Sequence, residues 1–498
     1  MMMFDLLYME NTKTMSSETV DDMLFNELFD YIFVNDRDLF ECFIKVVSSP
    51  LTDRTSIIKR QEIVKDLMTY SDFLDKISEI CKAAKDVQPE SRKNLYQKID
   101  ALKRLQINFR TVEVIFDYVE ELGNLIKKYN FTAADLNKIK NYFSPIDKFL
   151  DLRKGLHTLT LKYLNLNFYS GEVVLSDIAK FKTLTLECLE KDVYESNDLK
   201  KNRLFSKKNK DMNGNQINYS EIKDIERQID QITEKSIFDF CRVLTGIYSF
   251  FKSLFRSLYE QFEFYRSAIV FIQYLKNNGF MYSFPEISED DKFLEANGLY
   301  LLPLALKNKD IKTNDVNTMN NSIFIITGYN RGGKTTFLRS IGFAQILAQS
   351  GLVVPSAYYK CSVFNFILEH FPRNEDKYLS SGLFEDEIKR LRNNFDYIKN
   401  NSLILMNEAF ATTVESEGEL IAADIITALA QTDSLIFFVT HFYGLAMHID
   451  DINHKLKGKA TAVNLITQKY EKPNARTNFK IVQGDPIPNY KINLEDFI

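Results

Sequence analysis

One short stretch, ITGYNRGGKTTFLRS at residues 326–340, restricts the possible folds more than any other part of this 498-residue chain. Residues 328–335 fit the pattern G-x-x-x-x-G-K-[ST], in which a glycine-rich loop turns its backbone N–H groups toward phosphate oxygens. The apolar run SIFIIT (322–327) precedes the loop and predicts a buried strand. Apolar side chains from Phe337 to Leu347 then recur at helical spacing. This strand-loop-helix order predicts a phosphate-binding loop and disfavours a chance glycine-rich turn.

The polar residues of the loop have expected roles. Lys334 is expected to reach phosphate oxygens, and the Thr335 hydroxyl is expected to bind magnesium. The N-terminus of the following helix adds a favourable partial positive charge. The candidate nucleotide-binding residues are Gly328, Asn330, Gly332, Gly333, Lys334, Thr335 and Thr336.

A nucleotide-hydrolysing site also needs an acidic residue at the end of a neighbouring strand, and SLILMNEAF (402–410) supplies one. Glu408 is the candidate to orient or activate the attacking water, and the alternative is an exposed acid without a catalytic role. Asn407 stands where an aspartate usually helps to hold magnesium, so we expect weaker magnesium retention and slow turnover. His441 ends the run SLIFFVTH and is a candidate γ-phosphate sensor, although a lone histidine there is more often structural.

Composition excludes several classes of protein. Charged residues make up 26% of the chain with a net charge of −5, which does not indicate nucleic-acid binding at the level of the whole chain. The five cysteines form no C-x-x-C pair, so neither a zinc site nor a disulfide framework is expected. No basic leader and no run of 18 apolar residues is present. We therefore expect a cytoplasmic protein that does not bind membranes.

Proline and glycine divide the chain into two parts. No proline occurs between Pro145 and Pro285, whereas 11 of the 17 glycines follow residue 290. The proline-free part predicts long helices, including one very long helix or two consecutive ones that reach about residue 277. A coiled-coil seam within it is formed by Ile222, Ile225, Ile229 and Ile232. From about residue 286, short apolar strands alternate with helices, which predicts a mostly parallel sheet covered on both faces.

In several motifs the chain resembles the MutS family of DNA mismatch-repair ATPases. TGYNRGGKTTFLRS followed by GLVVPS (351–356) is similar to the family's TGPNMGGKST loop and its G-x-x-V-P-A segment. LILMNEAF is similar to the family's LVLMDE strand, and VTHFYGLA is similar to its ATHYFEL. NFKIVQGDP (478–486) resembles the end of the ATPase domain, and SSPLTDRTSIIKRQEIV (48–64) resembles the start of the helical core.

The resemblance implies an α-helical core and lever domain followed by an α/β P-loop ATPase domain of the ABC type. The expected boundaries are an N-terminal segment at 1–20, the core and levers at 21–285 with a tip loop near 200–217, and the ATPase domain at 286–498. It also implies ATP and Mg²⁺ as cofactors. The family's mispair-probing, connector and dimerisation-tail segments have no counterpart in this sequence, so a short form without mismatch preference is expected.

The family has a serine-containing segment that completes the ATP site of the neighbouring subunit. The corresponding residues here are YLSSGLFEDEIKRLR (378–392). Aligning Phe384 and Glu387 with the family places Gly382 at the serine position, and a shift of one residue places Ser381 there. The backbone amides of either residue are candidates to contact the γ-phosphate, and the alternative is an ordinary helix cap. Ile311 falls near the position where the family stacks an aromatic ring on adenine, so a weaker contact is expected.

Three functions are compatible with these features. The first is an ATP-driven homodimer, joined through the ATPase domains, whose levers grip mismatched or branched DNA. Its candidate phosphate contacts are Lys200, Lys201, Arg203, Lys207, Lys208 and Lys210, which alternatively form a solvated loop. The second is an ATP-gated clamp on a ribosome, an RNA or a protein. The third is a scaffold that binds ATP without hydrolysing it, which Asn407 leaves open.

Overall fold

The computed structural model describes residues 3–89, 101–164, 219–308, 311–371, 383–395, 397–398, 400–411, 413–468 and 478–486. The chain divides into two compact units. Unit 1 contains Met1–Phe4 and Asp72–Phe262, and unit 2 contains Asp5–Ser71 and Glu263–Ile498. Residues 21–285 were expected to form one helical domain. The compact units differ from that division, because Asp5–Ser71 and the residues after Phe262 belong to the same unit.

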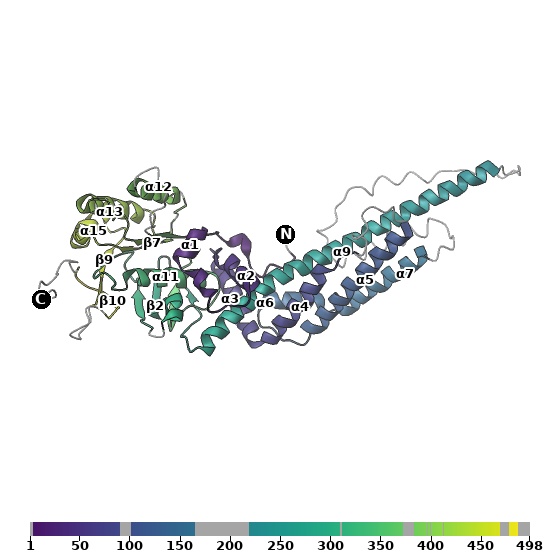
Figure 1. Ribbon diagram of the computed structural model, residues 1–498, viewed down its shortest axis with the longest axis horizontal. Helices are drawn as coiled ribbons and strands as arrows, with labels where there is room; N and C mark the ends of the chain where they lie inside the picture. The colour runs from purple at the N-terminus through teal and green to yellow at the C-terminus, as the bar shows by residue number, and fades with distance from the viewer. Residues whose placement is uncertain are drawn as a thin grey trace. The chain divides into compact units, whose positions relative to one another are not determined.

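Unit 1 is built from helices, and its longest helix continues past the end of the unit. α9 is a single helix of 59 residues that ends at Asn277, which selects the first of the two expected alternatives, one very long helix or two consecutive ones. In Figure 1, α5, α7 and α9 run side by side. The buried Phe251 ring of α9 lies 5.6 Å from the Phe116 ring of α5 and 6.2 Å from the Phe149 ring of α7. The bounds are α4 (Ser71–Asp86), α5 (Ala101–Ile126), α6 (Ala134–Phe143), α7 (Ile146–Leu164) and α9 (Tyr219–Asn277).

Unit 2 contains a six-stranded sheet with the order β10-β9-β4-β8-β7-β6. Strands β9 to β6 are parallel neighbours, and β10 pairs antiparallel with β9 at the edge. The three apolar runs predicted as strands are β4, β7 and β8, and all of their residues are buried. This confirms a mostly parallel sheet with both faces covered. The bounds are β4 (Ile323–Thr327), β6 (Phe366–His370), β7 (Ser402–Asn407), β8 (Leu435–Val439), β9 (Ala462–Thr467) and β10 (Ile481–Gln483).

Helices cover both faces of this sheet. Ile323, Ile404 and Ile436 point to one face, where they pack against apolar side chains of four helices. The opposite face packs against α11 (Lys334–Gln349), whose Gly342 approaches the Leu405 side chain of β7 so closely that a Cβ atom would lie 2.7 Å from it. Figure 1 shows α13 and α15 on one side of the strands and α11 on the other. The four helices are α12 (Leu383–Phe395), α13 (Glu415–Ala430), α14 (Tyr443–Met447) and α15 (Ile449–Leu456).

Smaller elements complete unit 2. A four-stranded mixed sheet has the order β1-β5-β2-β3, with β1 (Glu286–Ile287), β2 (Leu294–Leu299), β3 (Asn314–Asn317) and β5 (Tyr358–Cys361). The remaining helices are η1 (Met9–Asn11), α1 (Ser17–Asp22), η2 (Phe25–Leu28), α2 (Arg37–Val47), α3 (Arg54–Thr69) and α10 (Leu302–Lys307). Within the described ranges, no helix combines the length and the apolar character that a bilayer-spanning segment needs.

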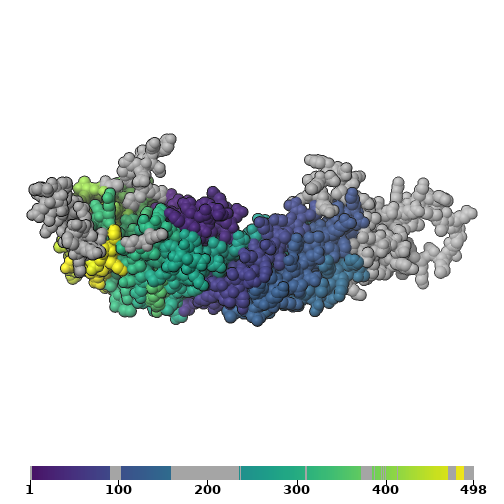
Figure 2. Space-filling view, turned by 60° about the horizontal axis from the view of Figure 1, so that its bottom comes forward, coloured from purple at the N-terminus to yellow at the C-terminus, as the bar shows by residue number. Residues whose placement is uncertain are grey.

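A fully buried arginine joins Asp5–Ser71 to the rest of unit 2. Arg60 of α3 donates one hydrogen bond to the Ser350 carbonyl at 3.0 Å and another to the Leu7 carbonyl, and its guanidinium lies 5.6 Å from the Phe264 ring centre. Ser350 caps the C-terminus of α11. Burial lowers the pKa of Arg60 to about 10, so the side chain stays charged at neutral pH. Figure 2 shows the N-terminal residues, in purple, packed on the teal surface of unit 2.

Replacing Arg60 with methionine should destabilise unit 2 strongly. The change leaves the carbonyls of Leu7 and Ser350 without a donor, and each buried unpaired group costs about 1–3 kcal/mol. We expect the free energy of unfolding, measured by urea denaturation, to fall by about 2–4 kcal/mol. The control is Lys65→Met on the same helix, where the side chain is exposed and its ammonium group lies over the Phe284 ring. Its loss should stay below about 1 kcal/mol, and equal losses in the two variants would contradict this role for Arg60.

Candidate functional site

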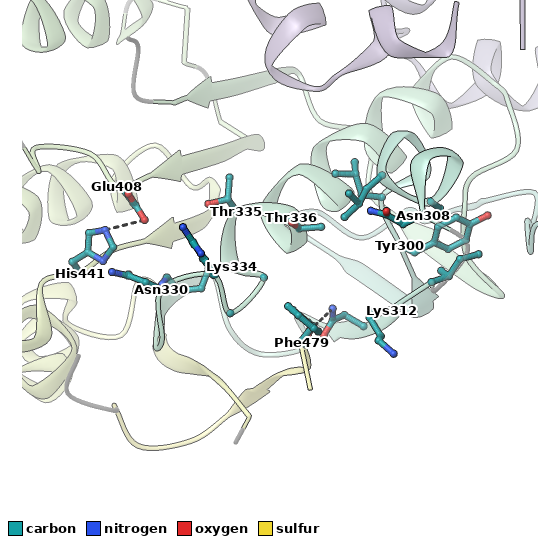
Figure 3. Close-up of a pocket in the computed structure, with 18 residues that line it drawn as sticks. Tyr300, Asn308, Lys312, Asn330, Lys334, Thr335, Thr336, Glu408, His441 and Phe479 are labelled. Carbon is teal, nitrogen blue, oxygen red and sulfur yellow. Dashed lines mark hydrogen bonds and ion pairs between the residues drawn. The ribbon is translucent and has the colours of Figure 1, made fainter. Parts of the chain in front are cut away.

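The candidate site lies where three neighbouring parallel strands end. β4 leads into the glycine-rich loop, β7 leads into Glu408, and β8 is followed by His441. Because β8 pairs with both β4 and β7, the carboxyl ends of the three strands share one edge of the sheet. Figure 3 shows Lys334, Glu408 and His441 converging there. The topology therefore brings together residues as distant in the sequence as Lys334 and His441.

The glycines of the loop are required by a threonine from β9. A Cβ atom at Gly328 would lie 2.1 Å from Thr467 Oγ1, and one at Gly332 would lie 2.8 Å from Thr467 Cγ2. Gly328 and Gly333 also have positive φ angles of 129° and 93°, which favour glycine. Thr467 is fully buried, and its hydroxyl oxygen accepts a hydrogen bond from the Tyr329 N–H at 3.1 Å. Thr467 thus holds the loop, although no local pattern in the sequence had pointed to it.

Lys334 is the first residue of α11, and Gly333 caps the helix. The Lys334 side chain is buried, and its Nζ donates to the carbonyls of Gly328 at 2.9 Å and Tyr329 at 3.1 Å. Burial lowers the pKa of Lys334, and the nearby Glu408 carboxylate opposes that effect. The helix N-terminus and the ammonium group together make this end of the pocket favourable for an anion.

Two oxygen-bearing side chains meet beside the loop. The Thr335 hydroxyl donates to Asn407 Oδ1 at 2.8 Å, joining the start of α11 to the end of β7. Among the described residues, no group of three or more His, Cys, Asp or Glu side chains could hold a metal ion. Hydroxyl and amide oxygens are nevertheless suitable ligands for Mg²⁺, which usually keeps several waters. The pair therefore fits a magnesium ion that is only partly coordinated by protein.

Glu408 and His441 form a second polar pair. His441 Nε2 lies 2.9 Å from Glu408 Oε1, and the two side chains are 34% and 30% exposed, respectively. The hydrogen bond from His441 lowers the pKa of Glu408 and outweighs the opposing effect of burial, while the charge of Lys334 acts in the same direction as His441. Glu408 is thus held as an ionised carboxylate at the edge of the pocket, as a residue that orients or deprotonates water must be.

The backbone of the turn after β7 is strained. Glu408 has a φ angle of 51° and Phe410 one of 65°, a left-handed conformation that bulky residues rarely adopt. Each such residue costs about 1–3 kcal/mol and persists only where the surrounding structure enforces it. Strained residues of this kind are concentrated at functional sites. The strain therefore indicates that the surrounding structure holds the turn that carries Glu408 in place.

A pocket of about 720 Å³ joins these groups, a size typical of small-molecule sites. Among the described lining residues, Lys312, Arg331 and Lys334 are cationic and Glu408 is the only carboxylate, so the balance favours an anionic ligand. Phe479 lies against the loop, with its ring 3.5 Å from where a Cβ atom of Gly333 would be. The other lining residues are Tyr300, Leu301, Leu304, Ala305, Asn308, Ile311, Asn314, Asn330, Gly332, Gly333, Thr335, Thr336 and His441.

The structure places most, but not all, of the predicted site residues. Gly328 and Asn407 lie at the base of the site and do not line the pocket. Ser381 and Gly382 lie outside the described residues, as do the cationic residues between 200 and 210. Sequence reasoning missed Thr467, Arg331 and Phe479. Arg331 lies within the glycine-rich loop and Phe479 within the NFKIVQGDP segment, so these two carried a signal, whereas Thr467 did not.

The comparisons with known proteins all point to the same family. The model of MutS domain V matches residues 324–494. The DNA mismatch repair protein MSH3 of Debaryomyces hansenii is 22% identical over 501 residues, covering 86% of this chain and 47% of that protein. The DNA mismatch repair protein MutS of Clostridium kluyveri is 23% identical over 496 residues, covering 90% and 54%. MutS protein homolog 4 of Homo sapiens is 32% identical over 142 residues, covering 28% and 15%. The chain thus spans about half the length of the relatives that match most of it.

Replacing Thr467 with valine should loosen the glycine-rich loop while preserving its packing. Valine keeps the shape of threonine but cannot accept the hydrogen bond from the Tyr329 N–H. An unpaired buried donor costs about 1–3 kcal/mol, so the affinity for ATP, measured by calorimetry, should fall about tenfold. Thr461→Val, at an exposed position just before β9, is the control and should leave affinity unchanged. Wild-type affinity in the Thr467 variant would show that this hydrogen bond does not shape the site.

Proposed function

Because this chain is a member of the MutS family, we propose that it is a DNA-binding ATPase of the mismatch-repair type. The observation that supports the proposal is the convergence of three groups at one sheet edge. These groups are the loop with Lys334, the Thr335–Asn407 pair and the Glu408–His441 pair. The names of the relatives support the DNA part of the proposal, since MSH3 and MutS are both called DNA mismatch repair proteins.

In this proposal the triphosphate of ATP occupies the glycine-rich loop. Backbone N–H groups of the loop and of the first turn of α11 donate to phosphate oxygens, and Lys334 turns its Nζ from the loop carbonyls to the phosphates. Mg²⁺, held by Thr335 Oγ1 and Asn407 Oδ1 with waters, would neutralise charge on the phosphates. Ile311 and Phe479 line the part of the pocket assigned to adenine, where the Phe479 ring offers a surface for stacking.

Glu408 is the proposed catalytic residue. Its ionised carboxylate accepts a hydrogen bond from the attacking water and orients it toward the γ-phosphate. His441 holds Glu408 in position and lies at the pocket wall, where it is placed to sense the γ-phosphate. Asn407 supplies an oxygen ligand without the negative charge of an aspartate, so magnesium retention is weak and turnover slow.

We further propose that the chain forms a clamp on DNA. The helices of residues 21–285 act as core and levers around DNA, and two chains pair through their ATPase domains as a homodimer. Each chain contributes backbone amides near Ser381 and Gly382 to the neighbour's γ-phosphate. The cationic residues from Lys200 to Lys210 contact DNA phosphates. These parts rest on the resemblance, since both segments lie outside the described residues.

Two substitutions separate ATP binding from hydrolysis. Lys334→Ala should abolish ATP binding, because it removes the cation buried beside the loop. Glu408→Gln should keep the affinity for ATP but lower turnover at least about 100-fold, the usual effect of losing a general base. Calorimetry and a phosphate-release assay measure the two quantities.

Two results would contradict this assignment of the ATPase site. The first is that a folded Lys334→Ala protein retains its affinity for ATP. The second is that the Glu408→Gln protein hydrolyses ATP at the wild-type rate. A wild-type protein that binds ATP without any turnover would support the scaffold function instead.

DNA binding is tested by its dependence on salt. Binding of the full chain to duplex and branched DNA should weaken as salt rises, with about 0.9 units of slope in log affinity against log salt per phosphate contact. Reversing the charges of Lys200, Lys201, Arg203, Lys207, Lys208 and Lys210 to glutamate should flatten that slope. Reversing the exposed Lys455 and Lys457 is the control and should not. Tighter binding to RNA than to DNA of equal length would favour the clamp on RNA or a ribosome.

A further inference from the structure

The strained turn after β7 is fixed by hydrogen bonds from two directions. The Glu408 N–H donates to the Val439 carbonyl of β8 at 2.8 Å, which is a contact within the sheet. The Phe410 N–H donates to Glu387 Oε1 at 3.0 Å, and Glu387 belongs to α12. The second contact links the turn to a helix outside the sheet. The left-handed backbone at Phe410 is therefore held from α12, and that at Glu408 is held from β8.

Glu387 is a buried carboxylate that serves two partners. Its side chain is 9% exposed, and the same oxygen also accepts from His370 Nε2 at 2.9 Å, at the end of β6. Burial raises the pKa of Glu387, but the hydrogen bonds from His370 and the Phe410 N–H outweigh that effect and lower it. An ionised acceptor makes stronger hydrogen bonds than a neutral one. Glu387 thus joins α12, β6 and the turn through charge-assisted bonds.

Ring packing reinforces the same connection. Phe410 is fully buried, and its ring lies 6.5 Å from the His370 ring and 6.4 Å from the Phe384 ring of α12. Because a packed core does not deform continuously, α12 cannot shift without displacing Phe410. Phe410 is two residues from Glu408, so any such displacement reaches the catalytic carboxylate.

We propose that Glu387 is a positioning residue that couples α12 to Glu408 and so sets whether the carboxylate faces the pocket. The proposal rests on the proposed function, because it assumes that Glu408 acts on the attacking water. Glu387 is not among the residues that line the pocket. Its removal should therefore affect the chemical step and spare ATP binding.

The first experiment separates kcat from ATP affinity. Glu387→Ala should lower kcat at least about tenfold, since small misplacements of a catalytic group cost up to 10²-fold, while the Kd for ATP stays within about twofold of wild type. Glu387→Gln keeps the shape and one acceptor oxygen, so kcat should recover part of that loss, and this variant serves if the alanine variant does not fold. The control is Glu385→Gln on the same helix, whose side chain is 63% exposed and pairs only at the surface with Lys389. It should behave as wild type.

The second experiment asks whether Glu387 acts through Glu408. In a Glu408→Gln background, adding Glu387→Ala should lower the residual rate by no more than about twofold, because residues that act as a unit are not additive. A wild-type kcat in Glu387→Ala, a parallel loss of ATP affinity, or a further tenfold fall in the double variant would overturn the proposal. Wild-type turnover in Glu408→Gln alone would instead overturn the catalytic role of Glu408, on which the proposal rests.

Discussion

Parallel pairing of β4, β8 and β7 is the constraint on which the site depends. Each strand contains a run of apolar residues and is buried on both faces, and the paired backbones leave the three carboxyl ends at one edge. The loop, Glu408 and His441 are brought together by that register alone. A sheet with a different strand order would leave the same motifs far apart. The chemistry of the site is therefore a consequence of which strands are neighbours.

Contacts from outside the three strands then fix the geometry of the edge. Thr467 of β9 packs against the glycines of the phosphate loop. Glu387 of α12 accepts a hydrogen bond from the turn that carries Glu408. The two parts of the site differ in how they reach a left-handed backbone. The phosphate loop uses Gly328 and Gly333, which adopt it at little cost, whereas the turn after β7 uses a glutamate and a phenylalanine. The second arrangement stores strain, so it needs a buried partner to persist.

Local patterns predicted some parts of the structure and not others. The strands, the glycine-rich loop and the long helix ending near residue 277 each follow from patterns contained within the element, and the structure has all three. Thr467 was not predicted, because its role depends on β9 pairing beside β4. Glu387 was used only to align its segment with the family. Its contact with Phe410 was not predicted, because the two residues belong to different elements. The place of Asp5–Ser71 in unit 2 depends on the buried Arg60, whose partners are also distant in the sequence.

The central claim is that this sheet edge binds ATP with magnesium and presents Glu408 to it. The most direct measurement is a structure of the full chain with Mg²⁺ and a non-hydrolysable ATP analogue. We predict phosphates against the N–H groups of residues 328–335, Mg²⁺ about 2.1 Å from Thr335 Oγ1, and the Glu408 carboxylate facing the γ-phosphate across a water. Nucleotide bound elsewhere, or Glu408 turned away from an occupied pocket, would contradict it.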